Sequence, residues 1–278
     1  MPLPIFEIAC VVVVVLTLVL MARRRPIWDL LTDYAALGVA GFLGEETCVR
    51  FYAYYHYAPS WHLRLDCVPV LVPLIWPLVI LSARDVAASV WPNITTWRPL
   101  VVLAVVAFDA SLVEVIAVRA GFWWWVDHGH LGVPILGILG WGYFALGADL
   151  ALSGRFFFPR EPSKAQRFLS VVIVAPLLTH ALIQLTWWSF FRWAQRNALG
   201  TASLWALAGI SAGVVALVIH ARRRGGGIPL SIAGPRMVAA GLFFALLIST
   251  APMDIPLWMH TTAIAIPYLA ASKFEFGS

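Results

Sequence analysis

The stretches EETCVRFYAYYHYAPSWHLRLDCVPVLVPLIW (residues 45–76) and DASLVEVIAVRAGFWWWVDHGHLGVPILGILGW (residues 109–141) follow one plan. In each, an acidic residue stands five positions before an arginine, an aromatic run follows, and a Val-Pro pair opens an apolar segment. The corresponding residues are Glu45, Arg50, Pro69 and Trp76 in the first copy and Glu114, Arg119, Pro134 and Trp141 in the second. The connecting segment is four residues shorter in the second copy. We interpret the pair as an internal duplication and as the candidate active centre.

The composition of the chain sets its class. Hydrophobic residues make up 61% of the 278 residues and charged residues only 12%, whereas soluble domains are roughly half apolar and about a quarter charged. We therefore predict an all-α integral membrane bundle, with residues 1–278 forming a single membrane domain. The three cysteines have no metal-ligand spacing, so neither a metal nor a redox role is expected.

Apolar segments along the chain predict about eight to nine transmembrane helices, judged against the roughly 20 residues that cross a bilayer. The predicted spans are Leu3–Met21, Leu30–Cys48, Val68–Leu81, Leu100–Val118, Val133–Leu152, Phe168–Phe190, Ala202–Ile219, Met237–Thr250 and Ile255–Ala271. Two of them, Val68–Leu81 and Met237–Thr250, are short. The two copies of the repeat, about residues 30–82 and 98–152, run in the same direction and are therefore parallel.

The basic residues predict an orientation. Loops on one side of the predicted bundle hold 14 of the 19 Lys and Arg residues, and loops on the other side hold 5. The positive-inside rule then places the N-terminus outside and the C-terminus in the cytoplasm of a multi-pass protein. Because topology accounts for the net charge of +5, we expect the lipid bilayer as a partner and no nucleic acid.

Acidic residues within the predicted spans point to chemistry. A charged group within a bilayer costs about 2.5–3.5 kcal/mol on insertion scales, so it normally faces protein or a wet cavity. Glu45 and Glu114 lie about 21–22 Å along their helices, at 1.5 Å per residue. This matched depth predicts that both open on one shared cavity. For Glu46 and Asp149 a role in helix packing is the favoured interpretation.

Aromatic runs follow both acids closely. Aromatic faces stabilise cations, and a carboxyl group removed from water favours its protonated form, which can donate its proton. The candidate catalytic residues are Glu114, Glu45 and Asp109. The candidate substrate-binding residues are Trp123, Trp125, Tyr52, Tyr54, Trp76, Trp141, Arg50 and Arg119. Glu114 is the favoured proton donor, because Glu45 occupies its place in the first copy while Asp109 lies about 140° away around the same helix.

Arg50 and Arg119 follow the acids by about one and a half helical turns, so an ion pair within one helix is awkward. Pairs between the copies, Glu45 with Arg119 and Glu114 with Arg50, are the arrangement that the spacing leaves open.

Over about Gly38–Leu152, the order of these motifs resembles the integral-membrane carotenoid biosynthesis family that includes bisanhydrobacterioruberin-type hydratases. The matching residues are Asp109, Glu114, Gly121, Trp123, Trp125, Gly132, Val133, Pro134, Gly140 and Trp141, with Glu45, Tyr52, Tyr54, Val68, Pro69 and Trp76 in the first copy. The family usually carries Asn-Phe where this chain has Gly137-Ile138, and a glycine-rich stretch where it has Cys48-Val49-Arg50-Phe51. The resemblance implies hydration of the terminal double bond of an acyclic carotenoid end group, giving a tertiary alcohol.

Three functions remain open from the sequence. The first is a carotenoid hydratase-like lyase, acting on a hydrophobic isoprenoid. The second is a membrane terpenoid or lycopene-type cyclase, which shares the acid protonation step. The third is a small-molecule transporter, because internal repeats and intramembrane acids also occur in transporters. Both enzyme reactions are redox-neutral, so no cofactor is expected.

Overall fold

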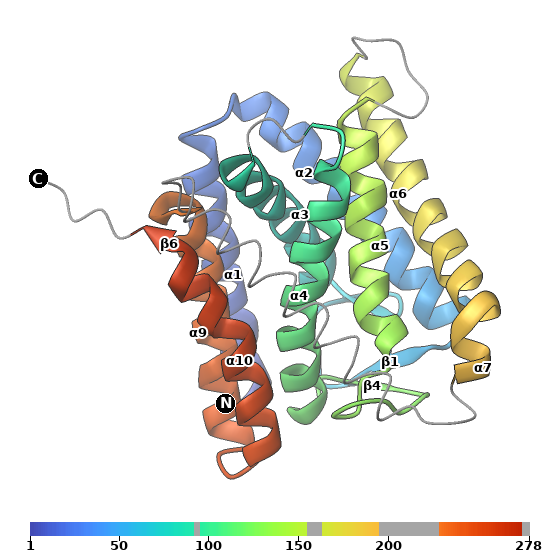
Figure 1. Cartoon of the computed structure of the whole chain (residues 1–278), viewed down its shortest axis with the longest axis vertical. Coiled ribbons are helices and arrows are strands. Elements are labelled where there is room, and N and C mark those ends of the chain that lie inside the picture. Colours follow the sequence, from blue (N-terminus) through green and yellow to red (C-terminus); the bar gives the residue numbers. More distant parts are fainter. Residues whose placement is uncertain (92–94, 155–162, 195–227, 274–278) are drawn as a thin grey trace, which may run out of the picture.

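The structure, a computed structural model, describes residues 1–91, 95–154, 163–194 and 228–273, with side chains placed up to residue 266. The described helices are α1 (Leu3–Ala22), α2 (Ile27–Glu46), α3 (Leu71–Val90), α4 (Arg98–Arg119), α5 (Ile135–Leu152), α6 (Lys164–Thr186), α7 (Arg192–Ala194), α9 (Leu230–Thr250) and α10 (Ile255–Ala271). Two π-helical segments, η1 (Thr47–Phe51) and η2 (Trp187–Phe191), extend α2 and α6. The predicted span Ala202–Ile219 lies outside the described residues. The predicted all-α bundle is confirmed (Figure 1).

Six described helices are long and apolar enough to cross a membrane: α1, α3, α4, α5, α6 together with η2, and α9. Helix α2 carries the acidic residues Asp29, Asp33, Glu45 and Glu46, which lower its hydropathy. It nevertheless packs against α3 and α6 as part of the same bundle. The prediction of a multi-pass helical membrane protein is therefore confirmed.

Helices α3 and α9 are longer than the spans predicted for them. The predicted span Val68–Leu81 stopped before Arg84 and Asp85, and the predicted span Met237–Thr250 began after Arg236. In the structure these charged residues lie inside the helices and form ion pairs with residues outside their own helix. Because a paired charge can be buried, the hydropathy pattern alone placed these helix ends too early or too late.

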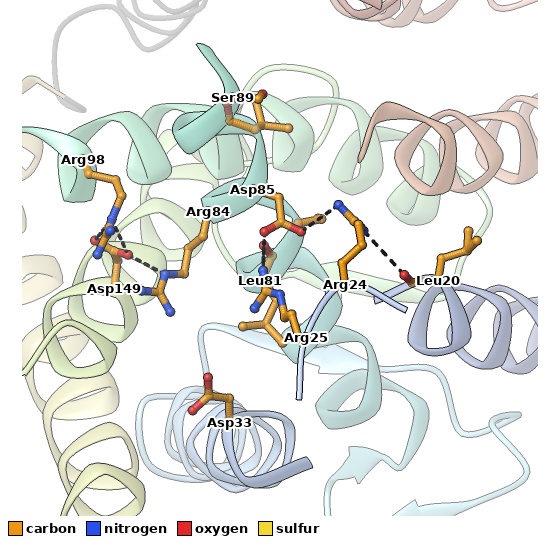
Figure 2. Close-up of polar contacts among 12 residues, drawn as sticks. Leu20, Arg24, Arg25, Asp33, Leu81, Arg84, Asp85, Ser89, Arg98 and Asp149 are labelled. Carbon is orange, nitrogen blue, oxygen red and sulfur yellow. Dashed lines mark hydrogen bonds and ion pairs between the residues drawn. The ribbon is translucent and has the colours of Figure 1, made fainter. Parts of the chain in front are cut away.

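Ion pairs around Asp85 and Asp149 join neighbouring elements of the bundle (Figure 2). The positive-inside rule predicts that this end of the bundle faces the cytoplasm. The Nε atoms of Arg84 and Arg98 lie 2.7 Å and 3.2 Å from Oδ1 of Asp149. Arg25, in the turn after α1, pairs with Asp85 of α3. The side chain of Asp149 has no exposed area, so its contacts fit the packing role that we favoured for it.

A short antiparallel ribbon joins the two copies of the repeat. Strand β1 (Tyr55–Tyr57) follows α2, strand β4 (Trp123–Trp125) follows α4, and the two strands pair at one end of the bundle (Figure 1). The register pairs Tyr55 with Trp125, His56 with Trp124 and Tyr57 with Trp123. This register is symmetric about His56 and Trp124, as expected for two copies related by a pseudo-two-fold axis. The remaining short pairs are β2 (Arg64–Leu65) with β3 (Val68–Pro69), and β5 (Ile228–Pro229) with β6 (Ser272–Lys273).

The repeat, α2–α3 and α4–α5, forms the centre of the bundle, and the other helices pack on its two sides. Helix α6 contacts α2 and α5, whereas α9 contacts α1, α3 and α4, and α10 contacts α4 (Figure 1). Leu37 of α2, Ile80 and Leu81 of α3, and Phe108 of α4 are fully buried between them. The two copies therefore enclose their facing side chains between helices rather than exposing them to lipid.

We predict that Asp149→Asn destabilises the bundle by about 3–5 kcal/mol, because it leaves buried arginine charges without their partner. Thermal unfolding of the detergent-solubilised protein measures the change. Lys164→Met is the control, since the pair of Lys164 with Asp29 is largely exposed and its loss should leave the unfolding temperature unchanged. Equal effects of the two substitutions would contradict a structural role for the buried pair.

Candidate active site

A cavity of about 650 Å³ lies inside the bundle. Residues of helices α1–α6, α9 and α10 line it, and both Glu45 and Glu114 are among them. Its volume falls within the roughly 300–1,000 Å³ of small-molecule sites, which are mostly apolar with a few placed polar groups. The prediction that the two acids open on one shared cavity is confirmed.

Three hydrogen-bond donors hold Glu45. The hydroxyl of Tyr55 donates to Oε2, the hydroxyl of Tyr57 donates to the same oxygen at 2.6 Å, and Nε1 of Trp76 donates to Oε1 at 2.9 Å. Alternate side chains of a strand project to the same face, so β1 directs both tyrosines toward the acid. Glu45 is buried by this arrangement.

Three donors also hold Glu114, in the same pattern. Nε1 of Trp123 and Nε1 of Trp125 donate to Oε2 at 2.9 Å and 3.1 Å, and Nε1 of Trp141 donates to Oε1 at 2.7 Å. The first two belong to strand β4 and the third to α5, just as the partners of Glu45 belong to β1 and α3. Each copy of the repeat thus carries one acid, two donors from its strand and one tryptophan from its second helix.

Aromatic rings from the two copies meet around the acids. The rings of Trp76 and Trp141 lie 4.5 Å apart between centroids, and those of Tyr55 and Trp125 lie 4.6 Å apart. Phe144 packs on Trp76 at 4.6 Å. Such faces carry the negative quadrupole that attracts a cation, so the walls of the cavity can stabilise positive charge beside the carboxyl groups.

The tyrosine hydroxyls remain protonated in this environment. Burial raises the pKa of both Tyr55 and Tyr57 well above the usual range of a phenol. A neutral hydroxyl can both donate and accept a hydrogen bond, whereas an indole N–H can only donate. The two acids therefore occupy equivalent positions with chemically different partners.

Asp109 also lines the cavity, but as half of an ion pair. Its carboxylate pairs with Arg236 of α9, and Nη1 of Arg236 also donates to Oγ of Ser82. An aspartate beside a guanidinium favours its ionised form, which has no proton to donate. The pair forms a polar patch in the cavity, and Gln184, which donates to the Tyr54 hydroxyl at 2.9 Å, forms a second one.

Arg50 and Arg119, predicted to bind the substrate, are not among the residues that line the cavity. Arg50 pairs with Glu46 at 2.7 Å and with Asp66, and Arg119 pairs with Asp254 at 3.0 Å. Their side chains are about half exposed. The cross pairs between copies are therefore wrong, because tyrosine and tryptophan donors occupy the oxygens of both acids.

In the first aromatic run, the predicted residues Tyr52 and Tyr54 are not the ones that bind the acid. Tyr54 lines the cavity, but Tyr52 stacks on it at 5.0 Å without being a lining residue itself. The direct partners of the acid, Tyr55 and Tyr57, were missed by sequence reasoning. The signal that could have found them is the alternation in Tyr-His-Tyr, which matches Trp-Trp-Trp of the second copy as a strand.

One group of described residues places three potential metal ligands together: Glu46, Asp66 and Cys67. The guanidinium of Arg50 bonds to both carboxylates of this group. It therefore supplies the positive charge at that position, which lies outside the cavity.

The apolar helices and the cavity that they line define a multi-pass membrane protein with an internal, largely apolar site. A family model described as "Carotenoid biosynthesis protein" matches residues 3–217, and the chain belongs to this family. The resemblance stated from the motifs is confirmed, and the chain's role lies in carotenoid biosynthesis. Comparisons with curated proteins and with solved structures gave no match. Helices α9 and α10, which complete the cavity, lie beyond the matched residues.

Two glycines leave room for the tryptophans that hold the acids. A Cβ atom added at Gly137 would lie 2.5 Å from Cζ2 of Trp125, and one at Gly41 would lie 2.8 Å from Cδ1 of Trp76. A Cβ atom at Gly234 of α9 would meet nothing within 4 Å. The small size of Gly137 matches the position of Trp125.

We predict that Gly137→Ala destabilises the protein by about 1–3 kcal/mol, the usual cost of overpacking a filled core. Gly234→Ala should raise stability slightly, since alanine favours a helix by up to about 1 kcal/mol over glycine. Thermal unfolding of both variants in detergent makes the comparison. Unchanged stability in Gly137→Ala would mean that Trp125 is not held against this helix.

Proposed function

We propose that this protein is a membrane-embedded carotenoid hydratase, which adds water to the terminal double bond of an acyclic carotenoid end group. The observation that carries the proposal is the pair of buried glutamic acids in one aromatic cavity, each with three hydrogen bonds. Membership in the carotenoid biosynthesis family supports the substrate class. The product of this reaction is a tertiary alcohol.

The first step is proton transfer from the carboxyl pair to the less substituted carbon of the alkene. The π electrons form the new C–H bond, and the positive charge develops on the tertiary carbon. Rings of Trp76, Trp141 and Trp125 surround the carboxyl groups, so the developing cation lies against aromatic faces and a carboxylate. Both features lower the energy of a charge-separated state inside an apolar site.

The second step is capture of the cation by water. The oxygen of water forms the C–O bond, and one of its protons returns to the carboxylate that gave up the first, which restores the enzyme. Polar side chains in the cavity support this step, since the pair of Asp109 and Arg236, Ser82, and Gln184 offer positions where water can be held.

The polar patches favour hydration over the alternative of a terpenoid cyclase. Cyclisation uses the same protonation, but a neighbouring alkene captures the cation, which requires that water be excluded. A cavity wall that includes an ion pair, a hydroxyl and an amide is less suited to that exclusion. The transporter alternative is less favoured, because donors on strands β1 and β4 hold both acids in place through hydrogen bonds.

Expression of the full chain in a lycopene-producing host tests the proposal directly. We predict that the pigment gains the mass of one water molecule per converted end group, measured by mass spectrometry of extracted carotenoids. An isomer of unchanged mass would replace the hydratase by a cyclase. Unchanged pigment, from a chain shown to be folded in the membrane, would contradict both.

Substitutions in the cavity test the acids separately. We predict that Glu45→Gln and Glu114→Gln each lower product formation by about 10²–10⁴-fold, the usual contribution of general acid–base catalysis. Asp109→Asn should keep measurable turnover, because an ion-paired aspartate is not the proton source. Glu46→Gln is the matched control: it follows Glu45 directly, pairs with Arg50 and is not among the lining residues. Loss of product in Asp109→Asn alone, from a variant shown to be folded in the membrane, would assign the proton-donor role to Asp109.

A further inference from the structure

The two glutamic acids of the cavity have equivalent positions but different hydrogen-bond partners. We infer that Glu45, held by tyrosine hydroxyls, is the neutral member that gives the proton, and that Glu114, held by indoles alone, is the ionised member that stabilises the cation. The inference rests on the proposed function for its catalytic consequence. The protonation states themselves are a property of the cavity and can be measured without turnover.

Because Glu45 and Glu114 lie close together, we expect one of them to be protonated and the other ionised. Glu45 and Glu114 line the same cavity, and the rings of the indoles that bind them, Trp76 and Trp141, lie 4.5 Å apart between centroids. Two carboxylates that share an apolar site repel each other, so such pairs hold a proton between them.

The partners of Glu114 favour the carboxylate. Nε1 of Trp123 and Nε1 of Trp125 both donate to Oε2, and Nε1 of Trp141 donates to Oε1. An indole N–H donates and cannot accept. A protonated Glu114 would have no acceptor for its O–H among these three side chains, whereas an ionised Glu114 uses all three donors. Hydrogen bonds to the charged form favour that form.

The partners of Glu45 allow the neutral acid. The hydroxyls of Tyr55 and Tyr57 both contact Oε2, and only Trp76 is a partner that cannot accept. A hydroxyl rotates, so one tyrosine can accept a hydrogen bond from the O–H of protonated Glu45 while the other donates a hydrogen bond to the same carboxyl group. Glu45 can therefore hold a proton with its own O–H hydrogen-bonded to a tyrosine. The sequence pattern favoured Glu114 as donor, but it did not reveal these partners.

With Glu45 protonated and Glu114 ionised, the net charge of the site stays constant during the reaction. Before protonation, Glu114 carries one negative charge and Glu45 none. When the O–H bond of Glu45 breaks and the C–H bond forms, a second carboxylate and one carbocation appear together. The cation then lies near two carboxylates, so their repulsion is offset at the moment it arises. Water attack forms the C–O bond, and its released proton returns to Glu45.

Infrared spectroscopy of the full-length protein in membranes tests the assignment without substrate. A protonated carboxyl group gives a C=O stretch that shifts in D2O and is distinct from the bands of a carboxylate. We expect this band to be lost in Glu45→Gln and retained in Glu114→Gln. Glu46→Gln controls for the substitution itself, because its carboxylate pairs with Arg50.

The possible outcomes separate the inference from the proposed function. Loss of the band in Glu114→Gln but not in Glu45→Gln would overturn the assignment, and so would its persistence in both variants. If the band behaves as expected but the wild-type chain converts no carotenoid, the assignment stands and the proposed function fails. If carotenoid is hydrated but the band is lost in Glu114→Gln and retained in Glu45→Gln, the proposed function stands and the assignment fails.

Paired double variants test the role of the hydroxyls as positioning groups. Tyr55→Phe with Tyr57→Phe removes the acceptors around Glu45, so we expect its C=O band to shift and product formation to fall at least tenfold. Trp123→Phe with Trp125→Phe removes two donors from Glu114, and should leave the Glu45 band in the spectrum at its position. A band that is insensitive to the tyrosine pair and moves with the tryptophan pair would contradict the assignment.

Discussion

Burial of two carboxyl groups inside an apolar membrane bundle is the constraint on which this structure depends. A buried acid without partners costs several kcal/mol, and hydrogen bonds are what offset that cost. The chain provides these hydrogen bonds twice in the same arrangement. A short strand directs alternate side chains at the acid, and a helix adds one tryptophan. Pairing of β1 with β4 then joins the two sets of donors into one site.

The same constraint accounts for the rest of the bundle. Several charges inside the described helices have their partner on a neighbouring helix, as Arg84 and Arg98 do for Asp149 and Arg236 does for Asp109. These pairs join neighbouring helices, and apolar side chains fill the space between them. Helix α9, beyond the family-matched residues, thereby contributes both a wall and a charge to the cavity.

Much of this could be predicted from the sequence, because apolar length and repeated spacing are properties of the chain itself. The helical class, the parallel repeat and the shared cavity of Glu45 and Glu114 follow from them. The partners of the acids could not be predicted in the same way, since a strand of three residues has no clear pattern within an aromatic run. Arg50 and Arg119 were misplaced for a related reason: spacing along the chain does not show that Glu46, Asp66 and Asp254 lie within their reach.

The central claim is that the two acids act on one carotenoid end group held between them. A structure of the protein determined with an acyclic carotenoid bound tests it most directly. The account predicts that the terminal double bond lies in the cavity, within reach of Glu45 and beside Glu114, against the rings of Trp76 and Trp141. A carotenoid bound on the lipid-facing surface, or with its end group away from both carboxyl groups, would contradict the account.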